Sequence, residues 1–250
     1  MSRTDESVFE VPQWQKRSAL ALGAEAIERL SRARVLVVGV GGVGAAAAEM
    51  ICRAGVGHMT IVDGDTVEAS NRNRQLPALS STEGAAKTAV VAARLLDINP
   101  GLDICALQEF VSGTRISEIL DTGKFDFVVD AIDSLSPKIE LISASVARSL
   151  RIVSSMGAGA KLDPSQVQIG DIAKSNGCAL AKAVRRRLRE LGIEKGVEVV
   201  FSPESPLPGA VLDQNPGLPG KRSTVGTVSY MPVVFGCFCA AAAIRRLSGK

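Results

Sequence analysis

Val35-Leu36-Val37-Val38-Gly39-Val40-Gly41-Gly42-Val43-Gly44 joins an all-apolar, largely β-branched run to a glycine-rich turn. The apolar run indicates a central parallel strand that is buried on both faces. The turn contains the pattern G-x-G-x-x-G, and an alanine-rich helix is expected after it, over residues 42–54. Glycines in this context let the backbone approach a phosphate or ribose, and the helix N-terminus favours negative charge. The candidate nucleotide contacts are therefore Gly39, Gly41, Gly42 and Gly44.

Strand-like and helix-like segments alternate along the rest of the first 155 residues. Strands are expected at 35–38, 58–62, 104–107, 125–129 and 152–154, and helices at 42–54, 84–98, 115–120 and 137–150. This alternation predicts an α/β fold with a Rossmann-like, doubly wound, mainly parallel sheet and helices on both of its faces.

The chain is expected to form one domain over residues 1–250 with three parts. Residues 1–31 are an N-terminal helical arm with one helix from Gln13 to Leu30, and residues 32–160 are the nucleotide-binding core. Residues 161–250 are a C-terminal extension with strands at 166–169 and 197–201 and a basic helix at 179–191. Residues 202–223, rich in proline and glycine, are expected to form a flexible functional loop or lid.

The composition gives little direction about partners. A net charge of +3 is only mildly basic, so it neither requires nor excludes a polyanion. The five cysteines include no Cys-x-x-Cys pair, which argues against a zinc site and a disulfide framework. Residues 1–10 contain no apolar core of a secretory signal. We expect reduced thiols and a cytoplasmic location.

A terminal apolar segment, Tyr230 to Ile244, is about 15 residues long and so falls short of the ~20 residues that span a bilayer. We expect a buried terminal helix and no stable membrane insertion.

Asp63 follows the second expected strand and is placed to bind ribose hydroxyls. These features also suit a dehydrogenase, but residues 63–75 read Asp63-Gly64-Asp65-Thr66-Val67-Glu68-Ala69-Ser70-Asn71-Arg72-Asn73-Arg74-Gln75. Arginine binds phosphate oxygens in a bidentate manner and asparagine adds directional donors, and Lys87 supplies a further cation. A dinucleotide enzyme has no need of so many phosphate-seeking side chains.

Another polar cluster, Asp130-Ala131-Ile132-Asp133-Ser134, follows an apolar strand. It is expected at the carboxyl edge of the sheet, where ligands of open α/β folds bind. Its carboxylates could hold Mg²⁺, which prefers oxygen ligands and bridges phosphates.

These motifs, in this order, resemble the ubiquitin-activating-enzyme-like superfamily: G-x-G-G-V-G at 39–44, D-x-D-x-V-x-x-S-N-x-x-R-Q at 63–75, Lys87, and D-A-I-D at 130–133. Within it, residues 17–23, 130–138, 155–160, 168–174 and 201–206 look most like the tRNA threonylcarbamoyladenosine dehydratases.

The resemblance implies ATP and Mg²⁺ as cofactors and a role for each matching residue. Gly41 and Gly42 would face the nucleotide, Asp63 would hold its ribose, Asn71, Arg74 and Lys87 would contact phosphates, and Asp133, followed by Ser134, would ligate the metal. Arg17 resembles an arginine that reaches into the partner subunit's site, so a homodimer is implied. In such enzymes ATP activates the carboxylate of the threonylcarbamoyl group on a tRNA adenosine, and cyclisation then expels AMP.

Some residues keep two interpretations. Asp65 could ligate metal or cap its loop by an Asx turn, and Lys138 could reach the site or lie on a solvated helix face. The cluster Lys182, Arg185, Arg186, Arg187 and Arg189 could bind tRNA phosphates or be ordinary surface. Cys178 is interpreted as an inert thiol rather than a nucleophile, and His58 as structural. The role of Arg72 stays open.

Two rival functions remain. One is adenylation of the C-terminus of a ubiquitin-like sulfur-carrier protein, against which stand the missing Cys-x-x-Cys pairs and the basic helix. The other is an NAD(P)-dependent oxidoreductase or a nucleotide sensor, against which stand Arg74, Lys87 and Asp133. The sequence leaves open which tRNAs bind, whether a cysteine desulfurase or sulfur acceptor is a partner, and whether a monovalent cation is bound.

Overall fold

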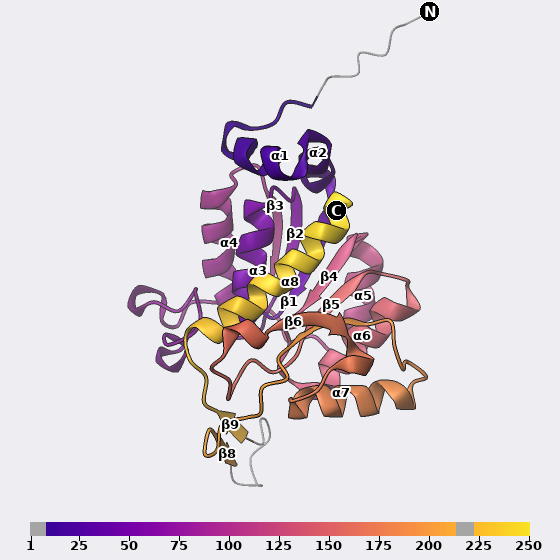
Figure 1. Ribbon diagram of the computed structural model, residues 1–250. Coiled ribbons are helices and arrows are strands. Elements are labelled where there is room, and N and C mark those ends of the chain that lie inside the picture. The colour runs from indigo at the N-terminus through magenta and orange to yellow at the C-terminus, as the bar shows by residue number, and fades with distance from the viewer. Residues whose placement is uncertain (1–8, 214–222) are drawn as a thin grey trace, which may run out of the picture.

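The structure is a computed structural model that describes residues 9–213 and 223–250. Its described residues contain a seven-stranded sheet in the order β3-β2-β1-β4-β5-β7-β6 (Figure 1). Neighbouring strands are parallel, except that β6 runs antiparallel to β7 at one edge. The prediction of an α/β, Rossmann-like, mainly parallel sheet is confirmed. The strands are β1 (Arg34–Val38), β2 (His58–Val62), β3 (Asp103–Leu107), β4 (Phe127–Asp130), β5 (Ile152–Ser155), β6 (Gln168–Asp171) and β7 (Glu198–Phe201).

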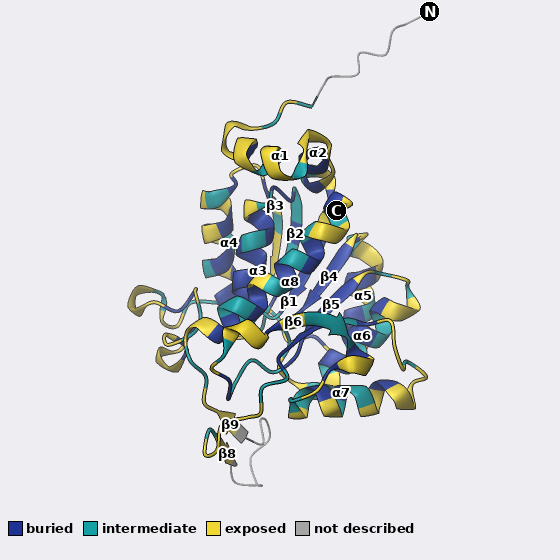
Figure 2. Cartoon of the chain, viewed as in Figure 1, coloured by how far each residue is buried: buried dark blue, intermediate teal, exposed yellow. Residues whose placement is uncertain are grey.

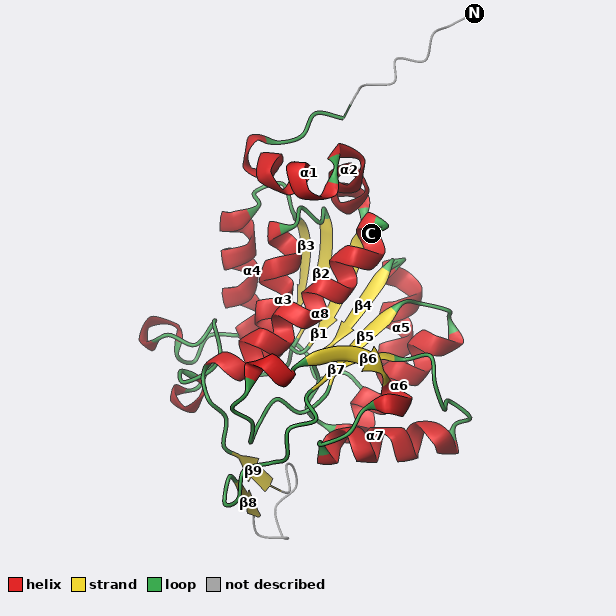
Figure 3. Cartoon of the chain, in the orientation of Figure 1, coloured by secondary structure: helices red, strands yellow, loops and turns green. Residues whose placement is uncertain are grey.

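Both faces of the sheet are covered by helices (Figure 3). The apolar run of β1 explains why, since Val35 and Val37 pack into one core while Leu36 and Val38 pack into the other. The first core is closed by α3 (Gly42–Arg53), α4 (Lys87–Ile98) and α8 (Tyr230–Ser248). The second is closed by α5 (Thr114–Gly123), α6 (Leu135–Ala147) and α7 (Ala179–Glu190).

The parallel strands bring their carboxyl ends to one edge of the sheet. The glycine turn follows β1, Asp63 follows β2, and the segment after Asp130 follows β4. Because β3, β2, β1 and β4 are successive neighbours, the loops that follow them lie side by side along this edge. The fold therefore gathers three of the predicted motifs at one place.

The N-terminal arm differs from the single helix predicted for Gln13 to Leu30. It consists of a 3-10 turn, η1 (Gln13–Gln15), followed by α1 (Lys16–Leu22) and α2 (Ala24–Arg32). Gly23, with φ +92°, separates the two α-helices because this backbone conformation cannot continue a helix. The arm lies at the amino-terminal edge of the sheet (Figure 1).

Several predicted boundaries are wrong by a few residues. The helix expected from Gly84 begins at Lys87, because Ala86 instead forms a β-bridge with Thr66. The strand expected from Phe125 begins at Phe127. Short 3-10 turns that were not predicted are η2 (Ala69–Asn71), η3 (Ser80–Thr82), η4 (Pro164–Gln166) and η5 (Ile172–Lys174).

The proline- and glycine-rich segment 202–223 is not simply a loop. β8 (Val211–Asp213) pairs with β9 (Ser223–Val225) in a separate antiparallel ribbon. The prediction of a segment without regular structure is therefore wrong at both strands. The rest of it between them, residues 214–222, lies outside the described residues.

The expected terminal helix is present as α8, which has 19 residues and continues past the apolar segment 230–244 to Ser248. It is long and apolar enough to cross a membrane by length and composition, yet half of its apolar window is buried inside the protein. Phe235 and Cys239 are fully buried, and a Cβ on Gly236 would lie 2.5 Å from the carbonyl oxygen of Val43. α8 therefore packs tightly on α3, and its mixture of buried and exposed residues is visible in Figure 2.

Candidate functional site

The glycine turn after β1 is pressed against the neighbouring strand end. Gly39 has φ +86°, and a Cβ there would lie 2.7 Å from the carbonyl oxygen of Ala131 at the end of β4. A Cβ on Gly44 would lie 1.7 Å from the carbonyl oxygen of Gly39. Only glycine fits both positions, so the first turn of α3 sits close against the strand edge with its backbone N–H groups near the turn.

Gly41 and Gly42 have different neighbours. Gly41 is the N-cap of α3, and a Cβ on it would lie 3.6 Å from the side-chain amide of Gln75. A Cβ on Gly42 would lie 2.8 Å from Cβ of Pro232, in the first turn of α8. Gly42 therefore also serves the packing of the last helix, a role that the motif did not predict.

Asp63 ties the end of β2 to the glycine turn. Its Oδ2 accepts a hydrogen bond of 2.7 Å from the backbone N–H of Val40, and its Oδ1 accepts one of 2.8 Å from the N–H of Asp65. Burial raises the pKa of Asp63, although these hydrogen bonds oppose the shift. Each carboxylate oxygen keeps a second lone pair, so a hydroxyl donor can still bind.

Asp65 and Lys87 form an ion pair, with Oδ2 and Nζ 2.7 Å apart. Lys87 is only 5% exposed, and its backbone N–H also donates to the carbonyl of Asp65. The sequence left two interpretations of Asp65 open, metal ligation and an Asx turn. In the structure its carboxylate instead accompanies the lysine that we expected at the phosphates.

The loop that contains Asn71 and Arg74 is folded on itself. Asn71 is buried and its Oδ1 accepts from the N–H of Glu68 at 3.3 Å. Nη1 of Arg74 donates to the carbonyl of Ser70 and to Oδ1 of Asn73, both at 2.9 Å. Both bonds are made by Nη1. The guanidinium has five N–H donors in all, so three are not used by these two bonds.

Arg72 turns into the same loop. Its Nη1 donates to Oγ of Ser80 at 2.9 Å and its Nε donates to the carbonyl of Ala69. These bonds hold the exposed side chain on the loop that carries Arg74, and they do not assign it a contact with a ligand.

The two carboxylates of the Asp130–Asp133 motif have different surroundings. Asp130 is fully buried, and its Oδ2 accepts from Nζ of Lys138 at 2.6 Å and from Oγ of Ser154 at 2.5 Å. Lys138 is also fully buried, so both of its predicted roles, a site cation and a solvated helix face, are wrong. Asp133 is exposed at the edge, 3.3 Å from Oγ of Ser134, which caps α6.

Asp130 is not suited to hold a metal in this arrangement, because it has no exposed surface and its Oδ2 is paired with the ammonium of Lys138, while its Oδ1 accepts from the N–H of Ile132. Among residues 9–213 and 223–250, no three His, Cys, Asp or Glu side chains gather as a metal site. Mg²⁺ that is held mainly by phosphates needs only one or two carboxylates, and Asp133 has the exposure for that role.

Arg17 is not brought to this edge. It is exposed on α1, two residues after Gln15, whose Nε2 donates to the carbonyl of Arg53 at the end of α3. The glycine turn lies at the other end of α3, a helix of 12 residues or about 18 Å. His58 also lies at that far edge, where its Nδ1 is 2.9 Å from Oδ2 of Asp103, as its structural interpretation expected.

Phe110 is a candidate that sequence reasoning missed. It follows β3 and is 78% exposed, and a Cβ on Gly64 would lie 2.6–2.8 Å from three ring atoms. The ring therefore lies on the Gly64 backbone, beside Asp63. Its neighbours are anchored, since Val111 is buried and Glu109 forms a bidentate pair with Arg115. The sequence signal for this contact was Gly64, because a residue without a side chain leaves room for a ring to lie on its backbone.

The basic helix α7 presents only part of its predicted cluster to solvent. Lys182, Arg186, Arg187 and Arg189 are exposed. Arg185 instead donates to the backbone carbonyl and hydroxyl of Ser175, so it ties α7 to the loop before it. Cys178 caps α7 with its sulfur, 3.5 Å from the backbone nitrogen of Ala181, and the interpretation of Cys178 as an inert thiol stays a prediction.

Comparison with known proteins identifies the family to which this sequence is similar. The ThiF family model matches residues 15–250. The tRNA threonylcarbamoyladenosine dehydratase of Bacillus subtilis is 46% identical over 191 residues, 76% of this chain and 75% of that protein. The enzyme of the same name from Escherichia coli is 33% identical over 256 residues, 95% of each chain.

A solved structure agrees over nearly the whole chain. The E. coli tRNA N6-threonylcarbamoyladenosine dehydratase in complex with ATP superposes with a TM-score of 0.86 at 32% identity, covering 97% of this chain and 98% of that one. The sulfur carrier protein ThiS adenylyltransferase of E. coli is 31% identical over 132 residues, 53% of this chain. The family match spans both the nucleotide edge and the C-terminal extension, and the chain belongs to the ThiF family.

Proposed function

We propose that this chain is an ATP-dependent tRNA threonylcarbamoyladenosine dehydratase, which cyclises the modified adenosine through an adenylated carboxylate. The observation that carries the proposal is the 95% mutual coverage with the E. coli enzyme of that name, because it includes the C-terminal extension. The likeness to the sulfur-carrier adenylyltransferase covers only about half of the chain. The division into arm (1–31), core (32–160) and extension (161–250) is part of the proposal.

ATP lies along the carboxyl edge, in the order of the strands. Its phosphates bind over the glycine turn after β1, with Gly39, Gly41, Gly42 and Gly44 allowing close approach and Asn71, Arg74 and Lys87 donating. Its ribose binds Asp63 after β2. Since β3 is the next strand, the adenine lies after β3, where the exposed ring of Phe110 offers a surface for stacking.

Magnesium fits the edge through Asp133, with Ser134 beside it. When bound, the ion would neutralise phosphate charge and make pyrophosphate a better leaving group. Asp65 supports the phosphate site indirectly, because its carboxylate holds the ammonium of Lys87 2.7 Å away. A monovalent cation is not required by any side chain that we assign to the site.

The chain's own contribution is binding, orientation and positive charge. The substrate carboxylate attacks the α-phosphate of ATP, a P–O bond forms, and pyrophosphate leaves. A nucleophilic atom of the carbamoyl group then bonds to the activated carbonyl carbon and gives up its proton, while the acyl C–O bond to AMP breaks. AMP leaves with one carboxylate oxygen, so the net change in the nucleoside is loss of water. Arg74 and Lys87 stabilise the charge that moves onto phosphate oxygens during both steps.

A homodimer completes the site. Arg17 lies about one α3 length from its own glycine turn, so we assign it to the site of the partner subunit. The exposed cations of α7 are the proposed contact for tRNA phosphates. The expected location is cytoplasmic, in keeping with cysteines that form no disulfide among the described residues.

The deciding experiment uses tRNA that carries threonylcarbamoyladenosine. The purified protein is incubated with it, ATP and Mg²⁺, and the nucleosides are analysed by mass spectrometry after mild digestion. An ATP-dependent loss of one water from the modified nucleoside is the expected result. No loss, together with an adenylate that forms only when a small carrier protein is added, would replace the proposal with sulfur-carrier activation.

A further inference from the structure

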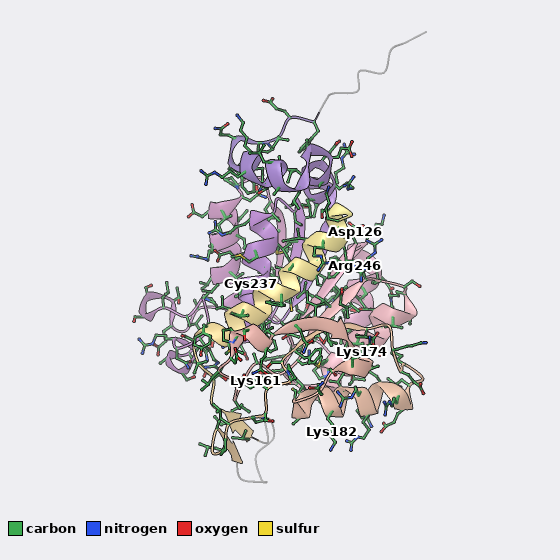
Figure 4. All side chains as sticks on the ribbon, in the orientation of Figure 1. Asp126, Lys161, Lys174, Lys182, Cys237 and Arg246 are labelled. Carbon is green, nitrogen blue, oxygen red and sulfur yellow. The ribbon has the colours of Figure 1, made fainter. Side chains whose placement is uncertain are left out.

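Lys161 is a buried lysine that plays no part in the site described so far. It is 2% exposed, and its Nζ donates to the carbonyl oxygens of Gly177 at 3.2 Å, Ser202 at 3.0 Å and Glu204 at 2.6 Å. Figure 4 places it between the main sheet and the β8–β9 ribbon. Its ammonium therefore has one acceptor for each of its three N–H groups.

The acceptors come from separate parts of the extension. Gly177 precedes α7, whereas Ser202 and Glu204 follow β7, and Lys161 itself follows β5. The Glu204 carboxylate does not pair with the ammonium; it accepts the backbone N–H groups of Leu162 and Asp163. Burial lowers the pKa of Lys161, while the charges of Cys178 and Glu204 oppose that shift. Backbone carbonyl dipoles thus stabilise the charge of the Lys161 ammonium. Its Nζ joins the loop after β5 to the loop before α7 and the loop after β7.

The segment around Lys161 is connected to the loop before α8. The N–H of Ala160 donates to the carbonyl of Gly226 at 2.8 Å. The hydroxyl of Tyr230 donates to the carbonyl of Leu162, also at 2.8 Å. The first bond holds the backbone of Gly226, next to Thr227, and the second holds the side chain of Tyr230, three residues after Thr227.

Thr227 contacts the loop that contains Asn71 and Arg74. Its carbonyl accepts from Nδ2 of Asn73 at 3.0 Å, and Oδ1 of the same asparagine accepts from Nη1 of Arg74 at 2.9 Å. Asn73 is thus clamped from both ends of its amide. Asn73 therefore links the Arg74 guanidinium to Thr227 of the extension.

We propose that Lys161 is a positioning residue for the nucleotide: by binding three carbonyls from two loops it places Thr227, and through Asn73 it orients Arg74 toward the phosphates of ATP. The inference rests on the ATP site proposed above. It does not rest on the tRNA substrate, so its test needs none.

The alternative is that Lys161 only stabilises the fold. The two roles differ in one measurable respect, because a stabilising residue changes the unfolding temperature but not the affinity of folded protein for ATP. Lys161→Ala leaves a cavity that a short alkylammonium ion can enter. Propylammonium has three N–H donors, whereas tetramethylammonium has the same charge and none.

The experiment measures ATP affinity by calorimetry with Mg²⁺ for the wild type, Lys161→Ala and the matched control Lys174→Ala, an exposed lysine of the same region. Thermal unfolding is recorded for each. We expect Lys161→Ala to weaken ATP binding about tenfold. Propylammonium should restore most of that affinity and tetramethylammonium should not, while Lys174→Ala behaves as the wild type.

Wild-type affinity in folded Lys161→Ala overturns the inference, as does a loss that propylammonium leaves unchanged or that both ions restore equally. Failure of the wild type to bind ATP would instead defeat the proposed function itself.

If Lys161→Ala does not fold, a double-mutant cycle with Lys161→Gln and Asn73→Ala replaces it. Action through Asn73 predicts that the double variant binds ATP no more weakly than Asn73→Ala alone, whereas additive losses overturn the inference.

Discussion

Nζ of Lys138 lies 2.6 Å from Oδ2 of Asp130, and neither side chain has any exposed surface. Asp130 ends β4, three residues before the exposed Asp133, and Lys138 lies in the first turn of α6. Ser154 and the carbonyl of Ser155 complete the surroundings of the ammonium, so α6, β4 and β5 meet at one buried charge pair.

Lys138→Met should destabilise the protein by about 3–5 kcal/mol, because it leaves the Asp130 carboxylate buried without its counter-charge. Urea unfolding measures the loss. The double variant Lys138→Met/Asp130→Asn removes both charges and should regain more than half of it. A double variant that is no more stable than Lys138→Met would show that the charge pair is not the cause.

Glu49 should make stability depend on acid pH. Burial alone would raise the pKa of Glu49, but hydrogen bonds and charges of Arg94 and Arg53 outweigh it and hold that pKa below its ordinary 4.5. A lowered folded-state pKa gives stability that is present above pH 4.5 and is lost as the pH falls through the folded value.

Glu49→Gln should therefore cost about 1 kcal/mol at neutral pH, given that both arginines are half-exposed. Its unfolding free energy should converge with that of the wild type below pH 4.5. Urea unfolding over a pH series tests this, and parallel pH curves for the two proteins would contradict it.

Asp133→Ala should abolish ATP turnover while leaving the unfolding transition unchanged, because Asp133 is exposed and is the proposed magnesium ligand. Retained turnover would remove that role. Glu83→Ala, an exposed acid elsewhere, is the control.

Arg17→Ala should be inactive for a different reason, since its site lies in the partner subunit. Equal mixing and re-equilibration of Arg17→Ala with Asp133→Ala should then restore about a quarter of wild-type activity, because half of the dimers are mixed and each of these has one intact site. Activity that stays at zero on mixing, with subunit exchange verified, would argue against action across the dimer.

Phe110→Ala should weaken ATP binding about tenfold and reduce the preference for ATP over GTP, since stacking of an aromatic ring on a base contributes ~1–3 kcal/mol. Calorimetry with each nucleotide measures both effects. Leu191→Ala, another exposed apolar residue, is the control and should bind ATP normally. Unchanged affinity of Phe110→Ala would place the base elsewhere.

Replacing Lys182, Arg186 and Arg189 of α7 by alanine should weaken tRNA binding and lower the slope of log affinity against log salt by roughly 2–3, because each phosphate contact contributes about 0.7–0.9 to that slope. Filter binding at several salt concentrations measures it, and ATP affinity should be unaffected. A slope equal to that of the wild type would exclude α7 as the tRNA surface.

The sequence predicted the parts of this molecule in which local pattern and long-range structure agree. The run 35–38, the glycine turn and Asp63 carry their own signals, because a buried parallel strand and its nucleotide turn need particular residue types at fixed spacing. The carboxyl-edge location of Asp133 followed from the same alternation.

The rest depended on contacts between distant segments. Lys138 seemed a surface residue because nothing local shows that β5 brings Ser154 to meet it. Arg185 was predicted as part of the exposed basic cluster of α7, because the sequence does not show that Ser175 lies beside it. The pairing of residues 211–213 with 223–225 was hidden by the prolines and glycines around them. In each case the contacting residue is brought near by the way the chain folds, and the spacing of residues along the sequence does not show this.

The packing of α8 on the glycine turn has a consequence for synthesis. The turn is translated before Pro232 and Gly236, which contact Gly42 and the backbone of α3. A nascent or C-terminally truncated chain thus carries the complete nucleotide motif without the helix that closes the core behind it. The glycine turn therefore reaches its final packing only after α8 has been synthesised.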